Sequence, residues 1–464
     1  MSWNDILSAT ALEQAALIRS RALSSEELVR LYLERIDRLD PHLNAFVSCF
    51  HRRALSAARA KDAAVRAGGS LPAFHGVPIG IKDLNVVRFA WTRMGSRATP
   101  PIYSPVDDKT TAALRRGGFV ILGKLATSEV GAMPVTEPDT HPPTRNPWNV
   151  WHTAGGSSGG SGAAVAARLL PIAHGSDGAG SIRIPSAFCQ LYGIKPSRGR
   201  VANAYGKKDR DILYTCGPIA RSVADAAAML DTLAGLDGGR PHWAPPPPRP
   251  YRELLGERPI NLRVRVLTRP LFGTVLPEIA AAVERAAKLL GTMGHQVEEG
   301  APPEGSLEEF LPLWQRLVAD APITLLSRAQ PVTRWLVEAG RSLRAEDILA
   351  LHRRLAHRLL RDLGDADIWI TPTVPVPAPR VGAFAGLPPA EAFAGAAVLG
   401  AFTAIANVTG QPAASVPLGL TAEGLPVGLQ IIGRPGREEE VLAVSRQFEE
   451  AAPWRSLQAP VGAD

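Results

Sequence analysis

Segments with helical spacing alternate along this chain with short apolar runs that are typical of buried strands. Residues 111–124, TAALRRGGFVILGK, read as a helix, a Gly-Gly stop and a strand. The order recurs over 261–299, where a strand-like run precedes a helical pattern that turns at Gly294 into another strand. Because such alternation folds the chain back and forth onto one sheet, it predicts an α/β fold.

Other segments extend this pattern. Ser24 and Glu27 form a capping box, which predicts a helix that begins there and runs to Pro41. Residues 301–364 have a helical pattern among scattered arginines and are predicted to be a helical insert. The proline-rich segment 238–251 is expected to run extended over the surface. The last predicted elements are a strand within 366–379, a strand within 425–434 and a final helix from Glu438.

The composition excludes several classes of protein. With 45% hydrophobic and 20% charged residues, the chain is not compositionally disordered. The net charge of +7 comes without a block of basic residues, so nucleic-acid binding is not predicted. No stretch reaches 18 apolar residues and the N-terminus lacks the features of a secretory signal, so we expect no membrane contact.

Cysteine and histidine spacing argues against a disulfide framework and a metal site. Cys49, Cys189 and Cys216 are far apart and in no CxxC spacing, which fits a reducing cytoplasm. His352 and His357 are five residues apart and do not share a helix face. We therefore expect a cytoplasmic protein with no metal and no cofactor.

Two glycine- and serine-rich clusters lie within 153–189, and they are the densest functional signal in the chain. A phosphate-binding loop does not fit, because Ser161 stands where that loop needs lysine. Residues 155–159, GGSSG, match the nucleophile elbow of an α/β-hydrolase with Ser157 as nucleophile, but no histidine follows His357. In the third interpretation the nucleophile is Ser181, which follows three small residues whose amides can converge on an oxyanion.

A serine nucleophile needs a base, and two residues are candidates. His174 enters the second cluster, but a lone histidine there is more often a hydrogen-bonded structural residue. Lys82 lies in VPIGIKDL, among the most apolar surroundings of the eight lysines. Burial would lower the pKa of this lysine from about 10.4 to about 7–8 and let it act as a base. The alternative is a surface ion pair between Lys82 and Asp83.

Taken together, these motifs resemble the amidase signature family, serine hydrolases with a Ser–cis-Ser–Lys triad. The similarity spans nearly the whole chain. In order, the motifs are GVPIGIKD, LGK, TRNPWN, GGSSGGS, GSIRIPSAFC, GIKPS, GPIARSVADAAAML, TPTVPVPAP and the closing GQPAASVPLGLTAEGLPVGLQIIGRPGREEEVL. The resemblance implies one domain over 1–464, built as a three-layer α/β/α sandwich around a large mixed sheet, with 153–189 as its catalytic core segment.

The resemblance also implies roles for single residues. Ser181 matches the nucleophile, Ser157 the bridging serine on a cis peptide bond with Gly156, and Lys82 the base. The implied oxyanion hole consists of the amides of Gly178, Ala179, Gly180 and Ser181, and the implied supporting residues are Asp177, Arg183 and Ser158.

The chain departs from the family pattern at two places. Gly178 and Ala179 replace the usual Thr-Gly of DTGGSIR, which changes the rigidity of the loop and the width of the acyl pocket while keeping the backbone amides. Ile184 stands where the amidotransferase subunit of the family usually has glutamine, which weakens an ammonia-channelling role.

The expected function is hydrolysis of a carboxamide C–N bond through an acyl-Ser181 intermediate, by a monomer or homodimer acting on a small molecule. Aryl amides, carbamates, nylon-type amides and esters stay open as substrates. The alternatives are an amidotransferase A-type subunit, an idle binding protein on the same scaffold, and an esterase with Ser157 as nucleophile. We expect residues 125–135 and the 301–364 insert to line the pocket, with Trp314 and Trp335 assigned to the core.

Overall fold

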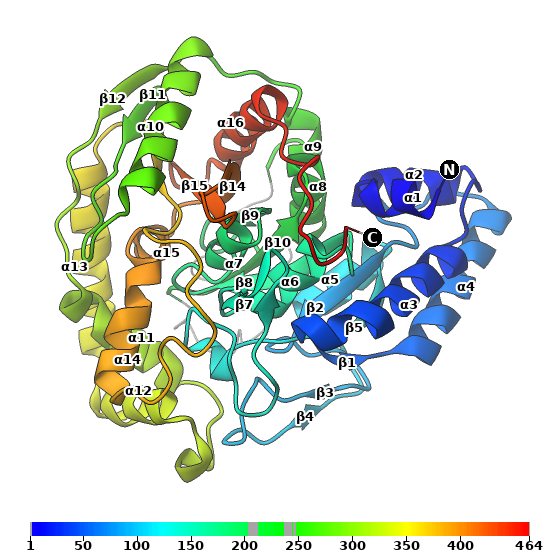
Figure 1. The fold of residues 1–464 in the computed structure, drawn as a ribbon, viewed down its shortest axis with the longest axis horizontal. Helices are drawn as coiled ribbons and strands as arrows, with labels where there is room; N and C mark the ends of the chain where they lie inside the picture. The colour runs from blue at the N-terminus through cyan, green and yellow to red at the C-terminus, as the bar shows by residue number, and fades with distance from the viewer. Residues whose placement is uncertain (1, 203–211, 236–243, 245–246, 464) are drawn as a thin grey trace.

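An eleven-stranded mixed sheet with helices around it organises the molecule (Figure 1). The computed structural model describes residues 2–202, 212–235, 244 and 247–463. The strand order is β1-β5-β2-β8-β10-β9-β14-β15-β13-β11-β12. The strands are β1 (Phe46–Cys49), β2 (Pro78–Lys82), β5 (Val120–Leu125), β8 (Ile172–Asp177), β9 (Tyr192–Lys195), β10 (Thr215–Ala220), β11 (Arg263–Val266), β12 (Gln296–Glu299), β13 (Ile368–Pro372), β14 (Ala413–Leu420) and β15 (Pro426–Gly433).

Helices cover both faces of the central strands. Every residue of β2, β5, β8, β9 and β10 is buried, as is expected of strands that are packed on two sides. The α-helices are α1 (Trp3–Ser8), α2 (Ala11–Arg19), α3 (Ser25–Leu43), α4 (His51–Ala67), α5 (Lys109–Arg116), α6 (Gly159–Ala166), α7 (Arg183–Phe188), α8 (Val223–Leu233), α9 (Tyr251–Leu254), α10 (Pro277–Thr292), α11 (Leu307–Ala319), α12 (Pro331–Ser342), α13 (Ala345–Leu363), α14 (Pro389–Ala397), α15 (Thr403–Thr409) and α16 (Glu438–Ala451). The predicted α/β class is confirmed.

Strand direction positions the functional residues. Strand β2 runs parallel to both of its neighbours, β5 and β8. The carboxyl ends of parallel strands meet at one edge of a sheet, so Lys82 at the end of β2 lies beside Asp177 at the end of β8. Two short hairpins, β3 (Trp91–Thr92) with β4 (Ile102–Tyr103) and β6 (Arg145–Asn146) with β7 (Asn149–Thr153), lie outside the main sheet.

Most of the predicted elements are confirmed, and one boundary is wrong. Ser24 and Glu27 form the capping box of α3, but this helix continues through Pro41 to Leu43. The proline lies in the last turn, and the helix closes on Asn44 in the left-handed conformation, with its N–H donated to the carbonyl of Asp40. Most of the proline-rich segment 238–251, which was expected to run extended, lies outside the described residues.

The 301–364 segment is helical, as predicted. It contains α11, α12 and α13 with a 3₁₀ turn, η2 (Leu326–Arg328), between the first two. These helices share a hydrophobic cluster with Ala132 and Phe393.

Among the described residues no single helix is long and apolar enough to cross a membrane. One pair of helices, Pro389–Gly400 and Thr403–Thr409, reaches that length and composition only when the two are counted together, and the pair is bent by 84°.

Candidate active site

The two glycine- and serine-rich clusters form two loops that lie side by side. The first connects β7 to α6, and the second connects β8 to α7. Ser158 joins them, because its hydroxyl donates to the carbonyl of Ser176 at 3.1 Å and accepts from the Ser176 amide at 3.3 Å. The backbone amide of Ser158 donates to the carbonyl of Ser181 at 3.3 Å. The loops are therefore held together by the residue next to Ser157.

Lys82 reaches the first loop from the end of β2. Its Nζ lies 2.7 Å from the Oγ of Ser157 and donates to the carbonyl of Ser176 at 3.4 Å. The lysine is fully buried. Burial lowers the pKa of Lys82 to about 7, although Cys216 and Asp177 act in the opposite direction. A large share of Lys82 is then neutral near pH 7 and able to accept a proton.

Asp83 does not pair with Lys82, so the surface ion pair considered for these two residues is wrong. The carboxylate of Asp83 lies 2.7 Å from the Nζ of Lys124 on β5, and both side chains are buried. The register explains the choice of partner. Ile81 is opposite Lys124 and Lys82 is opposite Leu125, so Lys82 and Lys124 point to opposite faces of the sheet. By the same alternation Asp83 faces the side of Lys124.

The loop that carries Ser157 is tightly fixed. The peptide bond between Gly156 and Ser157 is cis, as the resemblance implies. Thr136, which the sequence analysis missed, donates its hydroxyl to the carbonyl of Gly155 at 2.9 Å and accepts the amide of Gly159 at 3.1 Å. A Cβ at Gly156 would lie 2.7 Å from the backbone nitrogen of Val135, so a side chain has no room there. No motif in the sequence marks Thr136.

Ser181 lies in the second loop and faces the same cavity as Ser157. This cavity has a volume of about 500 Å³, and both serines form part of its wall. Within the described residues no protein atom forms a hydrogen bond with the hydroxyl of Ser181. The hydroxyl is thus available to a molecule in the cavity.

The backbone amides of the second loop have two different roles. Those of Gly178, Ala179 and Ser181 have no acceptor within the described residues, whereas Gly180 donates to the carboxylate of Asp177 at 2.7 Å. Gly180 therefore departs from the expected role, since its N–H holds the loop instead of facing the cavity. Its φ is 129°, and a Cβ there would lie 2.2 Å from the Oγ1 of Thr403. Only glycine fits this position.

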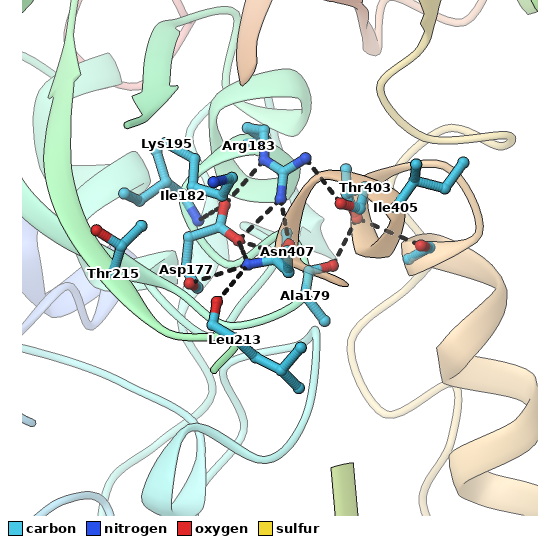
Figure 2. A network of polar contacts seen from close by, with 12 residues as sticks. Asp177, Ala179, Ile182, Arg183, Lys195, Leu213, Thr215, Thr403, Ile405 and Asn407 are labelled. Atoms are coloured by element: carbon cyan, nitrogen blue, oxygen red, sulfur yellow. Dashed lines mark hydrogen bonds and ion pairs between the residues drawn. The ribbon is translucent and has the colours of Figure 1, made fainter. Parts of the chain in front are cut away.

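A buried ion pair between Asp177 and Arg183 holds this loop (Figure 2). Asp177 accepts from Arg183 through both oxygens, at 3.0 Å to Nε and 2.9 Å to Nη2. Asn407 donates to the same carboxylate at 3.0 Å and to the carbonyl of Leu213 at 2.9 Å. Burial alone would raise the pKa of Asp177, but Arg183 and the other donors hold it well below its usual range. Asp177 is therefore a permanent anion that orients the loop.

Asn407, Thr403 and Gln430 belong to this network and were missed by sequence reasoning. Arg183 donates to the carbonyl of Thr403 at 2.8 Å and also contacts Asn407 and Gln430. These three residues lie more than two hundred positions beyond Arg183 in the chain. Gln430 lies within a quoted motif, LPVGLQIIG, but nothing in that motif marks its partner.

No histidine takes part in this arrangement. Among the described residues none forms a hydrogen bond with Ser157 or Ser181, and no group of three or more His, Cys, Asp or Glu side chains could hold a metal ion. His174 is fully buried, and neither of its ring nitrogens has a hydrogen-bond partner in the described part of the chain, contrary to the hydrogen-bonded role expected for it. Burial, with Lys82 and Lys124 nearby, lowers the pKa of His174 to about 3. It is therefore neutral.

Both expected lining segments contribute to the walls around Ser181. Val130 and Gly131 come from the 125–135 segment, and a face of α11 comes from the 301–364 insert. Trp314 belongs to the hydrophobic core, as expected, and it also lines the cavity. Its indole is buried and donates to the carbonyl of Ala132 at 3.1 Å, and the same ring forms a wall of the cavity. Trp335 packs against Phe393 with ring centroids 5.8 Å apart.

Comparisons with known proteins agree on one family. The family model described as Amidase matches residues 27–442. The chain is 38% identical over 323 residues to the 6-aminohexanoate-cyclic-dimer hydrolase of Pseudomonas sp. (strain NK87), covering 67% of this chain and 62% of that protein. Solved structures of a 6-aminohexanoate cyclic dimer hydrolase (TM-score 0.89, 32% identity) and of a bacterial aryl acylamidase (TM-score 0.88, 26% identity) each match 98% of this chain and 99% of their own.

Proposed function

The chain belongs to the amidase family and is an amide-hydrolysing enzyme, and on that premise we propose that Ser181 is its nucleophile, Ser157 its proton relay and Lys82 its base. One observation carries the proposal. The Nζ of Lys82 lies 2.7 Å from the Oγ of Ser157, in a place where burial keeps much of the lysine neutral. A lysine in that state accepts a proton from the serine that it contacts.

The first half of the reaction forms the acyl-enzyme. Lys82 takes the proton of Ser157, Ser157 takes the proton of Ser181, and the Ser181 oxygen attacks the amide carbonyl. The free amides of Gly178, Ala179 and Ser181 stabilise the oxyanion, and removal of one such donor typically costs about 10²- to 10³-fold in kcat. Collapse of the tetrahedral intermediate breaks the C–N bond as Ser157 gives its proton to the leaving amine and recovers one from Lys82.

The second half returns the enzyme to its starting state. Water enters where the amine was. Ser157 gives its proton to Lys82 and takes one from the water, which attacks the ester carbon of acyl-Ser181. The C–O bond to Ser181 then breaks, Ser157 reprotonates Ser181 and recovers a proton from Lys82, and the acid leaves. Asp177 and Arg183 act through the loop that they hold and touch no reacting atom.

The substrate is a small carboxamide with apolar groups on both sides. Most of the cavity wall is apolar, with Leu84, Met94 and Ile102 among its residues. The related cyclic dimer hydrolase and aryl acylamidase support linear, cyclic and aryl amides as the classes to test first.

The chain acts as a monomer or homodimer in the cytoplasm, and the three free cysteines support a reducing compartment.

Labelling with a fluorophosphonate, followed by mass-spectrometric mapping, tests these roles. The adduct should form on Ser181 and should be lost in Ser181→Ala and strongly slowed in Lys82→Ala. Ser161→Ala is the matched control, because this buried serine of the same cluster donates to the carbonyl of His174 and faces neither reacting group. An adduct on Ser157, with amide hydrolysis kept by Ser181→Ala, would contradict the proposal.

A second assay distinguishes a stand-alone amidase from an amidotransferase subunit. A stand-alone amidase should hydrolyse a small anilide as a purified chain, without any other protein, whereas a subunit should need its partner.

A further inference from the structure

Two cavities of unequal size meet at Ser181. The wide cavity has a volume of about 500 Å³. A narrow slot of about 50 Å³ also has Ser181 in its wall. Ser181 and Trp314 belong to the walls of both. The two spaces therefore share one proposed nucleophile, Ser181, and one aromatic wall, Trp314.

Ser157 distinguishes the two spaces. It lines the wide cavity together with Ser176 and Gly178, and it is absent from the wall of the slot. In the proposed mechanism Ser157 protonates the leaving amine, so the leaving nitrogen must lie on the side of Ser157. From this we infer that the wide cavity receives the amine part of the substrate and the narrow slot receives the acyl part. This inference rests on the proposed function and adds an orientation to it.

The slot sets the chemistry of the acyl group. Among the described residues, its wall has no charged side chain and is largely aromatic and aliphatic. The aromatic residues are Phe272, Phe310, Trp314 and Phe393. Ala179 also lines the slot and packs against the hydrophobic cluster that contains Trp314. Its methyl group occupies space that the glycine of the family pattern leaves open. The slot therefore takes a small, uncharged acyl group such as acetyl.

The wide cavity suits a larger, uncharged amine. Trp314, Leu317 and Val318 line it from one face of α11, as their three- and four-residue spacing requires. Asp320, the one carboxylate that the described residues contribute to its wall, lies 2.7 Å from Arg316 and is thereby neutralised. An aryl or alkyl amine without a second charge fits these surroundings.

A pair of isomeric amides tests the orientation. N-benzylacetamide and N-methyl-2-phenylacetamide contain the same atoms and both release an alkyl amine, so their intrinsic reactivity is similar. The benzyl group lies on the amine side in the first and on the acyl side in the second. One methylene in an apolar pocket changes specificity by about 10- to 200-fold, so kcat/KM should favour N-benzylacetamide by at least about 100-fold. Equal values, or a preference for the phenylacetyl isomer, would overturn the orientation.

The same assays separate this inference from the proposed function. Ser181→Ala should abolish hydrolysis of both isomers whichever is preferred, and hydrolysis kept by that variant would contradict the proposed function and the orientation together.

Variants of the two cavity walls test the assignment in a second way. Ala179→Gly should raise the ratio of hexanoyl to acetyl amide hydrolysis several-fold by widening the slot. Leu317→Ala should change the preference among amines and leave that acyl ratio as it is. A change of the acyl ratio by Leu317→Ala, without one by Ala179→Gly, would reverse the assignment.

Discussion

Lys82 and Lys124 are fully buried lysines on adjacent parallel strands, and they differ in what lies within reach of the ammonium group. Lys124 has the carboxylate of Asp83 at 2.7 Å and the hydroxyl of Thr92 at 2.7 Å. Lys82 has the hydroxyl of Ser157 at 2.7 Å and no carboxylate within ion-pair distance among the described residues. Burial lowers the pKa of both lysines; Asp83 opposes that shift in Lys124, and Cys216 and Asp177 oppose it in Lys82. Strand register thus gives Lys124 a carboxylate to pair with and places Lys82 in contact with a serine hydroxyl.

Lys195 shows that a lowered pKa does not by itself identify the base. This lysine is also fully buried, and burial, with Arg183 nearby, lowers its pKa to about 7. Its Nζ donates to the carbonyl of Pro196 at 2.8 Å. Lys82 and Lys195 therefore share a pKa near 7, and contact with a serine is what distinguishes them.

The largest expected effect comes from removing one of these two lysines. Lys82→Met should lower kcat/KM for an amide by about 10⁴-fold or more, because Ser157 then has no base. Lys195→Met is the matched control and should stay within about tenfold of wild type. Steady-state kinetics with folded variants, checked by circular dichroism, gives both numbers. Equal losses of kcat/KM in the two variants would mean that activity depends on any buried lysine. That result would contradict a specific role of Lys82 as the base.

Removing the carboxylate tests the other half of the comparison. Asp83→Asn leaves the buried charge of Lys124 uncompensated, which should lower the free energy of unfolding by about 3–5 kcal/mol. Urea denaturation measures this change. Adding Lys124→Met to the same chain should recover most of the loss, because no buried charge then remains. A loss below about 1 kcal/mol in Asp83→Asn would show that Lys124 finds another partner.

The pH dependence sharpens the contrast. Since burial lowers the pKa of Lys82 to about 7, lysine that is protonated below this pH cannot act as a base. The value of kcat/KM should rise about tenfold per pH unit up to about pH 7 and then level off, which makes it about 100-fold lower at pH 5 than at pH 9. A profile that keeps rising to pH 10 would show that Lys82 keeps the pKa of an exposed lysine.

The smallest effect concerns the serine next to the relay. Ser158→Ala removes the hydrogen bonds to Ser176 that join the two loops, at a cost of about 1 kcal/mol in the free energy of unfolding. The value of kcat should fall by about tenfold or less, because Lys82 and Ser157 stay in contact. A loss as large as that of Ser157→Ala would place Ser158 in the proton path instead of beside it.

Local patterns predicted much of the fold. The capping box of Ser24 and Glu27, and the Gly-Gly stop before β5, are interactions within a few residues, and both are where the sequence places them. The end of α3 was wrong because Pro41 loses only one hydrogen bond in the last turn.

The candidate site, like the fold, was predictable where its residues lie in local motifs and unpredictable where they depend on distant contacts. Lys82, Ser157 and Ser181 lie in recognisable motifs, whereas their surroundings depend on contacts that are distant in sequence. The pairing of Asp83 with Lys124 follows from the register of β2 and β5, which composition does not reveal. Thr136 and Asn407 are single polar residues without a motif, and their partners are known only once the chain is folded.

Titration of the lysine side chains by NMR tests the central claim most directly. With ¹³C at Cε of every lysine, the signals of Lys82 and Lys195 should both titrate near pH 7. Lys82→Arg should remove one of the two together with the amidase activity. If the signal assigned to Lys82 titrated near 10.4, as in an exposed lysine, the base would be charged at neutral pH and the proposed proton relay would be wrong.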